Sequence, residues 1–359
     1  MGRYAAAFAE VVDPRAENAR HDLSEILFIA LAAMLCGAET CADMALFGRS
    51  KVRFLRRFLE LPYGVPGHDT FSRVFRLIDP GELSQLLERF ARAFAKAAGA
   101  NRNAVVAIDG KACRRAYAAG RAHAPPMSVS AFAAETRMAL AFAPAPDGEE
   151  TQAALAAIRL LDLAGAIVTA DALHCHRGLA EEIVGRGGDY LLALKGNRPG
   201  LCADARDRLQ RAKGKNASVE TAAHGRIEAR TACVVSAGDM AKTRDFPGLR
   251  AIVRITAERD GKSEERLYLA SRLFGPKQAL AIVRGHWQIE NGLHWVLDVV
   301  FSEDQSRARK DHAPQNLAIL RRLAVNAARG PQDKTSLRGR VKRAGWDDAY
   351  LLKLLTHMR

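Results

Sequence analysis

Two short apolar segments, each followed directly by an aspartate, constrain the fold of this chain most strongly. Residues 104–108 read Ala-Val-Val-Ala-Ile before Asp109, and residues 165–170 read Gly-Ala-Ile-Val-Thr-Ala before Asp171. Apolar runs of this length, rich in β-branched residues, are typical of strands that helices cover on both faces. The sequence therefore predicts two aspartates at the carboxyl ends of two strands of one sheet.

The segments around these strands alternate between strand-like and helix-like patterns. Further strands are predicted at 128–132, 137–142 and 190–194, and helices at 150–162 and 177–187. Such alternation favours an α/β fold with a mixed sheet covered by helices. Residues 218–272 instead contain short β-like runs and are predicted to form an all-β insertion.

Both ends of the chain have helical patterns. Residues 22–60 place apolar side chains at helical spacing on either side of Gly37, which loosely resembles a helix-turn-helix and equally fits a plain helical bundle. Residues 276–298 and 313–359 are predicted to be helical too. We expect three regions: a helical domain at 1–98, the core at 99–328, and a basic helical tail at 329–359.

The balance of charge points to a polyanionic partner. Lys and Arg outnumber Asp and Glu by 54 to 40, giving a formal net charge of +14. Residues 302–359 alone carry 13 Lys and Arg against 6 Asp and Glu. A basic segment of this kind is expected to contact a nucleic-acid backbone.

Membrane insertion and disulfide bonding are not expected. The most apolar run, Ile26 to Cys36, is shorter than the roughly 20 residues that a spanning helix needs. None of the six cysteines forms a CxxC pair, and no secretory leader is recognisable. These features favour a reducing cytoplasmic location.

A third acid would complete a two-metal phosphoryl-transfer site, because two hard cations need carboxylates from several elements. Between residues 284 and 298, His286, Glu290, His294 and Asp298 recur every four residues and line one helix face. Glu290 could be the third carboxylate, with the histidines contacting substrate or phosphate. The alternatives are a zinc site built from His and Glu, or a polar face packed under a loop. Each aspartate alone could also cap the following helix.

Several polar and cationic side chains follow the predicted acids. They could contact DNA phosphates, or be solvated surface groups and favourable helix terminators. The residues assigned tentatively to DNA are Lys111, Arg114, Lys195, Asn197, His286, Asn291, His294, Arg307 and Arg309.

Taken together, these segments resemble the H-repeat-associated insertion-sequence transposases of the ISAs group, within the DDE superfamily. The resemblance covers nearly the whole chain. Its most specific blocks are Ala107 to Lys111, Gly165 to Ala172, Lys195 to Asn197, and His286 to Asn291 with Leu293-His294-Trp295.

The resemblance implies a ribonuclease H-like core in which Asp109, Asp171 and Glu290 bind two Mg²⁺ or Mn²⁺ ions. It also implies cleavage at transposon ends, strand transfer into target DNA, and a homo-oligomer assembled on DNA. Residues 1–98 would match the family's associated N-terminal domain.

The chain departs from the family pattern at two places. Residues 144–150 read Pro-Ala-Pro-Asp-Gly-Glu-Glu where the family usually carries Lys-x-Asn-Glu, and His176 stands where the family tends to place Gln. These differences leave two alternatives open. One is a catalytically inactive, transposase-derived DNA-binding protein, and the other is a DNA nuclease without strand transfer.

Overall fold

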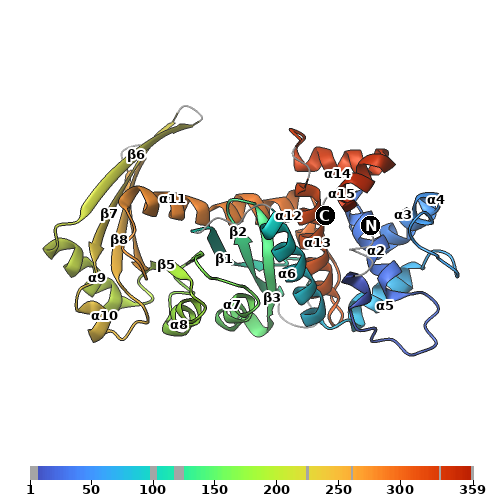
Figure 1. Cartoon of the computed structure of the whole chain (residues 1–359), viewed down its shortest axis with the longest axis horizontal. Helices are drawn as coiled ribbons and strands as arrows, with labels where there is room; N and C mark the ends of the chain where they lie inside the picture. The colour runs from blue at the N-terminus through green and yellow to red at the C-terminus, as the bar shows by residue number, and fades with distance from the viewer. Residues whose placement is uncertain are drawn as a thin grey trace.

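The structure of the protein is a computed structural model that describes residues 7–97, 103–116, 125–223, 226–259, 262–330 and 333–356. The predicted boundary between residues 98 and 99 lies outside these ranges. A mixed sheet runs through the middle of the molecule, with a helical body at one end and a long antiparallel extension at the other (Figure 1). The predicted α/β class with a mixed sheet is confirmed.

The sheet has nine strands in the order β3-β2-β1-β4-β5-β9-β8-β7-β6. Strands β1, β4 and β5 are parallel to one another, and the remaining neighbours pair antiparallel. The bounds are β1 Val105–Ala112, β2 Met127–Ala133, β3 Met138–Ala145, β4 Ile167–Ala170, β5 Asp189–Leu194, β6 Lys215–Ala223, β7 Arg226–Ser236, β8 Ala251–Arg259 and β9 Lys262–Ala270.

The predicted insertion extends the core sheet. Strand β9 pairs with β5, starting at Leu191 and Ala270, so the edge of β5 is covered and not left open to other chains. The prediction that the insertion is purely β is wrong, because helix α10 (Met240–Thr243) lies inside it and α9 (Pro199–Arg211) precedes it. Neither helix was predicted, and β6 begins before the predicted limit.

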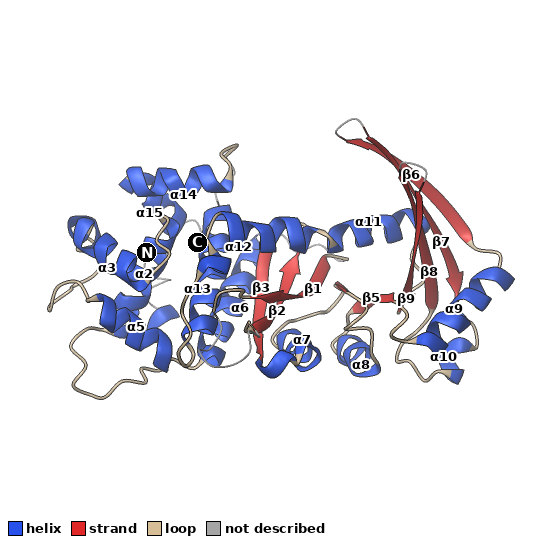
Figure 2. Cartoon of the chain, turned by 180° about the vertical axis from the view of Figure 1, so that it is seen from behind, coloured by secondary structure: helices blue, strands red, loops and turns tan. Residues whose placement is uncertain are grey.

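Helices cover both faces of the core sheet, as its two-sided apolar strands require (Figure 2). On one face Val106 and Ile108 of β1 share a buried cluster with α7 (Glu150–Arg159) and α8 (Arg177–Gly185). On the other face Val105 packs with α11 (Pro276–His286). The chain continues from α11 through a π-helical turn, Glu290–His294, into α12 (Trp295–Val299).

The helical body combines both ends of the chain, drawn in blue and red in Figure 1. One apolar cluster joins the N-terminal helices to the C-terminal ones. The central helix α13 donates two hydrogen bonds from the buried Asn316 amide to the carbonyls of Phe75 and Ile78. The helices are α2 Leu23–Leu35, α3 Cys41–Ser50, α4 Val52–Leu55, α5 His68–Leu77, α6 Pro80–Ala97, α13 Ala313–Arg329, α14 Leu337–Trp346 and α15 Asp348–Thr356.

Local sequence signals account for the boundaries of these N-terminal helices. The Asp22 side chain accepts a hydrogen bond from the Glu25 amide at the start of α2, and Thr40 and Asp43 form a reciprocal capping box on α3. Between them Gly37 has φ +90°, a conformation that glycine adopts without strain. The predicted break at Gly37 is therefore confirmed.

Some arginines of the basic C-terminal segment are buried in the protein. Arg321, Arg322 and Arg340 are 2%, 0% and 8% exposed. Arg322 pairs with Glu303 at 2.8 Å, and Arg340 donates to the Ala328 carbonyl at 2.9 Å. For these three arginines the expected contact with a nucleic-acid backbone is wrong, because they satisfy buried groups of the protein itself. None of the described helices combines the length and the apolar character needed to span a lipid bilayer.

Candidate active site

The two aspartates lie side by side at the point where two parallel strands part. The parallel pairing of β1 with β4 ends at Ile108 and Ala170, and Asp109 and Asp171 are the next residues of each strand. Strand β1 does not end at Asp109 as predicted. It continues to Ala112 because β2 goes on pairing with it. Side chains alternate along a strand, so Asp109 projects to the same face as Val105, which packs against α11.

The helical segment that follows α11 brings Glu290 and His294 to this face. His294 Nδ1 lies 3.6 Å from Asp109 Oδ2. Burial, together with the negative charges of Asp171, Glu290 and Glu150, raises the pKa of Asp109 to about 7. Unfavourable interaction with these neighbouring acids thus adds to the effect of burial on Asp109.

Asp171 also has the turn role that a single aspartate suggests. Its Oδ1 accepts hydrogen bonds from the amides of Leu173 at 3.0 Å and His174 at 3.3 Å. The Asn197 side chain donates to the Ala172 carbonyl at 2.8 Å, which ties the loop after β5 to the loop that carries Asp171. Asn197 thus links these two loops, and its contact with DNA stays a prediction.

The histidines of the acidic helix are neutral groups. His286 Nδ1 lies 3.0 Å from Thr169 Oγ1 on β4, and burial lowers the pKa of His286 to about 4. Burial lowers the pKa of His294 to about 3. Neutral imidazoles argue against cationic contacts to phosphate at neutral pH, although they remain hydrogen-bonding groups beside the acids.

Two further histidines lie close to Asp171. His174 is buried with Nε2 3.9 Å from Asp171 Oδ1, a neighbour that the sequence did not single out. His176, one of the departures from the family pattern, begins α8: its Nδ1 accepts a hydrogen bond from the Leu179 amide. The histidine at position 176 therefore has a structural role of its own as a helix cap.

Lys111 is enclosed by acids. Its Nζ lies 2.7 Å from Asp298, 3.1 Å from Asp304 and 3.7 Å from Glu303, and its side chain is 7% exposed. This ammonium group neutralises carboxylates on α12 and the following turn, which argues against the predicted phosphate contact. Arg114 is 79% exposed and reaches Asp304 at 3.4 Å, so it faces solvent.

The remaining tentative DNA contacts are distributed around the site. Lys195, Asn291, Arg307 and Arg309 are all exposed. Arg309 donates to the Arg115 carbonyl at 3.4 Å, so it lies beside the segment that follows β1. These four side chains remain accessible to a ligand.

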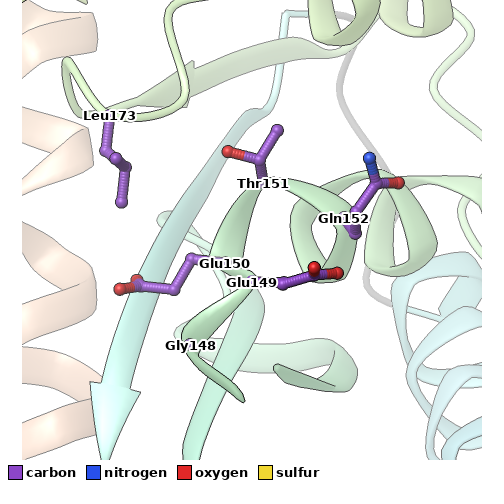
Figure 3. Close-up of a pocket in the computed structure, with 6 residues that line it drawn as sticks. All are labelled: Gly148, Glu149, Glu150, Thr151, Gln152 and Leu173. Atoms are coloured by element: carbon purple, nitrogen blue, oxygen red, sulfur yellow. The ribbon is translucent and has the colours of Figure 1, made fainter. Parts of the chain in front are cut away.

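Glu150, at the start of α7, lies against β1 beside the candidate site, a position that was not predicted from the sequence. Its Oε2 occupies the space where a Cβ of residue 110 would stand. Figure 3 shows the Glu150 side chain extending across strand β1, in a pocket lined by Gly148, Glu149, Glu150, Thr151, Gln152 and Leu173. Burial and the charge of Asp171 raise the pKa of Glu150. Glu150 closes the altered stretch 144–150, so this stretch still supplies an acid.

The acids fit a hard divalent cation by their chemistry. Carboxylate oxygens are the donors that Mg²⁺ and Mn²⁺ take, and the raised pKa of Asp109 marks negative charge that a cation would neutralise. Among the described residues no three His, Cys, Asp or Glu side chains are close enough together to form a metal-binding group. Asp109, Asp171 and Glu290 would have to turn toward a shared ion. Fold and site thus define an α/β protein with two aspartates where two parallel strands part and a glutamate on the facing helical segment.

Comparison with known proteins agrees with this class. Residues 101–327 match the family model described as Transposase DDE domain, and residues 5–91 match the model described as DDE_Tnp_1-associated. The chain therefore belongs to the DDE transposase family.

Individual relatives were found among curated and solved proteins. The chain is 29% identical over 352 residues to the "H repeat-associated putative transposase YhhI" of Escherichia coli K12, covering 93% of this chain and 92% of that protein. It is 39% identical over 54 residues to the "Inactive transposase YbfQ" of the same organism, covering 15% and 64%. The piggyBac transposase in a cryo-EM synaptic complex with hairpin DNA is 11% identical at a TM-score of 0.44, covering 99% and 79%.

Proposed function

We propose that this transposase is catalytically active, cutting DNA at the ends of its element and joining those ends to target DNA. The observation that carries the proposal is the placement of Asp109 and Asp171 where the pairing of β1 with β4 ends, with the segment of Glu290 and His294 over the same face. Burial, with the charges of Asp171 and Glu290, raises the pKa of Asp109 to about 7. An acidic triad drawn from two adjacent parallel strands and a crossing helix suits phosphoryl transfer.

In this proposal Asp109, Asp171 and Glu290 hold two Mg²⁺ or Mn²⁺ ions. Such ions lower the pKa of the attacking hydroxyl and stabilise the leaving oxygen in an in-line displacement. The protein's own contribution is placement: β1 and β4 fix two acids in register, and the π-helical turn presents the third. Water is the attacking group at the transposon end, and the exposed 3′ hydroxyl is the attacking group in target DNA.

The core order β3-β2-β1-β4-β5, with antiparallel and then parallel pairing, supports a ribonuclease H-like assignment for residues 99–328. We assign residues 1–98 to recognition of the element's ends and residues 329–359 to a basic helical C-terminal segment. The net charge of +14 supports DNA as the partner and the nucleoid as the location. Coordinated cleavage of two ends supports a homo-oligomer on DNA.

Cleavage of a labelled DNA that carries the element's own ends tests the proposal. We expect the native chain to cut in Mg²⁺, and Asp109→Ala and Glu290→Ala to bind the same DNA without cutting it. Binding without cleavage in all three would identify the inactive, DNA-binding alternative. Cleavage without joining of a supplied 3′ hydroxyl end to target DNA would identify a nuclease. Cleavage that survives either substitution would overturn the site.

A further inference from the structure

Glu150 reaches the acids from the opposite side of the sheet. It begins α7, which packs on the face of Val106 and Ile108, whereas α11 and the segment carrying Glu290 lie over the other face. A side chain at residue 110 would stand between Glu150 and the strand. Because residue 110 is glycine, Glu150 Oε2 fills that space against the residue that follows Asp109.

The charged groups around Glu150 are acidic. Among the described residues no lysine or arginine pairs with Glu150. Asp171 and Asp109 are the charged groups that interact with it. A carboxylate near two other acids without a protein cation costs free energy, and a bound metal ion would relieve that cost.

We propose that Glu150 is a fourth carboxylate of the metal site, supplying an oxygen to the ion held by Asp109 and Asp171, and that Gly110 is required to admit it. This inference rests on the proposed function, since it assumes a divalent ion at those aspartates. It gives the altered segment 144–150 a definite role and assigns the Asp109-Gly110 pair two linked tasks. Asp109 supplies one carboxylate ligand, and Gly110, which has no side chain, leaves room for the carboxylate of Glu150.

The adjacent Glu149 provides a matched control. It precedes α7, lines the same pocket and is exposed, but its charge does not contribute to the shift of Asp109. Figure 3 shows the two side chains pointing in different directions. Glu149→Gln and Glu150→Gln therefore change the net charge equally, but only Glu150→Gln removes a carboxylate of the proposed metal site.

The test measures Mn²⁺ binding to the full chain, without DNA, by electron paramagnetic resonance of the free ion and by titration calorimetry. We expect Glu150→Gln to raise the Mn²⁺ Kd about 10-fold or more, and Glu149→Gln to change it less than about 2-fold. Gly110→Ala should weaken binding as Glu150→Gln does. The double variant Gly110→Ala/Glu150→Gln should be no weaker than the single variants, since both remove the same ligand.

Two results separate the possible failures. If Asp109→Asn abolishes Mn²⁺ binding while Glu150→Gln binds as the native chain does, the fourth ligand is overturned and the proposed triad stands. If Asp109→Asn also binds normally, the proposed metal site itself is overturned. Thermal melting in EDTA checks folding, and should Gly110→Ala fail to fold, the comparison of Glu150→Gln with Glu149→Gln decides alone.

Discussion

At the scale of single residues, Asp109 is an acid whose ionised form is disfavoured in the folded protein. Its pKa is raised from 3.8 to about 7 by burial and by neighbouring acids. Between these values the folded protein holds a proton that the unfolded chain has lost. The free energy of unfolding therefore falls as the pH rises from about 4 to 7 and stays lower above pH 7.

Replacing Asp109 by Asn should remove this pH-dependent loss of stability, because asparagine does not ionise. In EDTA at pH 8 we expect Asp109→Asn to be more stable than the native chain by about 2–4 kcal/mol, and we expect most of the gain to vanish at pH 4.5. Urea unfolding at the two pH values measures the difference. Asp207→Asn is the control, because Asp207 forms an exposed ion pair with Arg211. If Asp109→Asn and the native chain were equally stable at pH 8, the raised pKa of Asp109 would be contradicted.

Lys111 offers the opposite case, a cation whose removal leaves acids unpaired. Lys111→Met should destabilise the protein by about 2–4 kcal/mol at pH 7, because Asp298, Asp304 and Glu303 would lose their shared counter-charge. Arg114→Met removes an exposed partner of the same Asp304 and should cost under about 1 kcal/mol. Chemical denaturation of both variants checks this, and similar losses in the two would show that the enclosure of Lys111 is unimportant.

At the scale of elements, the sequence predicted those features that depend on local periodicity. Apolar runs located β1, β4 and β5, and four-residue spacing located the helix that carries Glu290. Glu150 was missed because its contact depends on α7 crossing the opposite face of the sheet above Gly110. The enclosure of Lys111 was missed for a similar reason, since residues 111 and 298–304 are brought together only by the packing of α12 against the sheet.

Gly292 allows the π-helical turn that carries Glu290 and His294 to pack closely against β2. A Cβ at this position would lie 2.9 Å from Phe132 Cζ on β2, and the Gly292 carbonyl accepts a hydrogen bond from Arg329 of α13. The sheet and α13 thus hold the turn from two directions. Close contact at Gly292 therefore limits how far the π-helical turn can lie from β2.

Gly292→Ala should therefore push the turn away from β2. We expect metal-dependent cleavage to fall about 10-fold or more, because small misplacements of catalytic groups are costly, with a loss of stability of about 1–3 kcal/mol. The added variant Phe132→Leu should restore part of the cleavage by making room. Gly275→Ala, where no atom lies within 4 Å of the new Cβ, should keep the native rate. A native rate for Gly292→Ala would show that the turn tolerates displacement.

At the scale of the whole molecule, α13 connects the catalytic sheet to the helical body. Asn326 exchanges hydrogen bonds with the backbone of Ala139 on β3, at 2.9 Å and 2.7 Å. Nearly three turns earlier on the same helix, Asn316 donates to the carbonyls of Phe75 and Ile78. Helix α13 is almost wholly buried, with apolar neighbours from the sheet and from the N-terminal helices.

This arrangement predicts that the sheet and α13 do not form a stable unit without the N-terminal helices. A fragment of residues 99–359 would expose the face of α13 that α2, α5 and α6 cover, and would leave the Asn316 amide without its two carbonyl partners. We expect it to aggregate or to bind a hydrophobic dye, and to unfold without a sharp transition. Co-expression with residues 1–98 should yield a complex that purifies together and unfolds cooperatively, because the two pieces rebuild one core. A monomeric 99–359 fragment with a sharp thermal transition would show instead that α13 is stable on the sheet alone, and that the N-terminal helices are a separable domain.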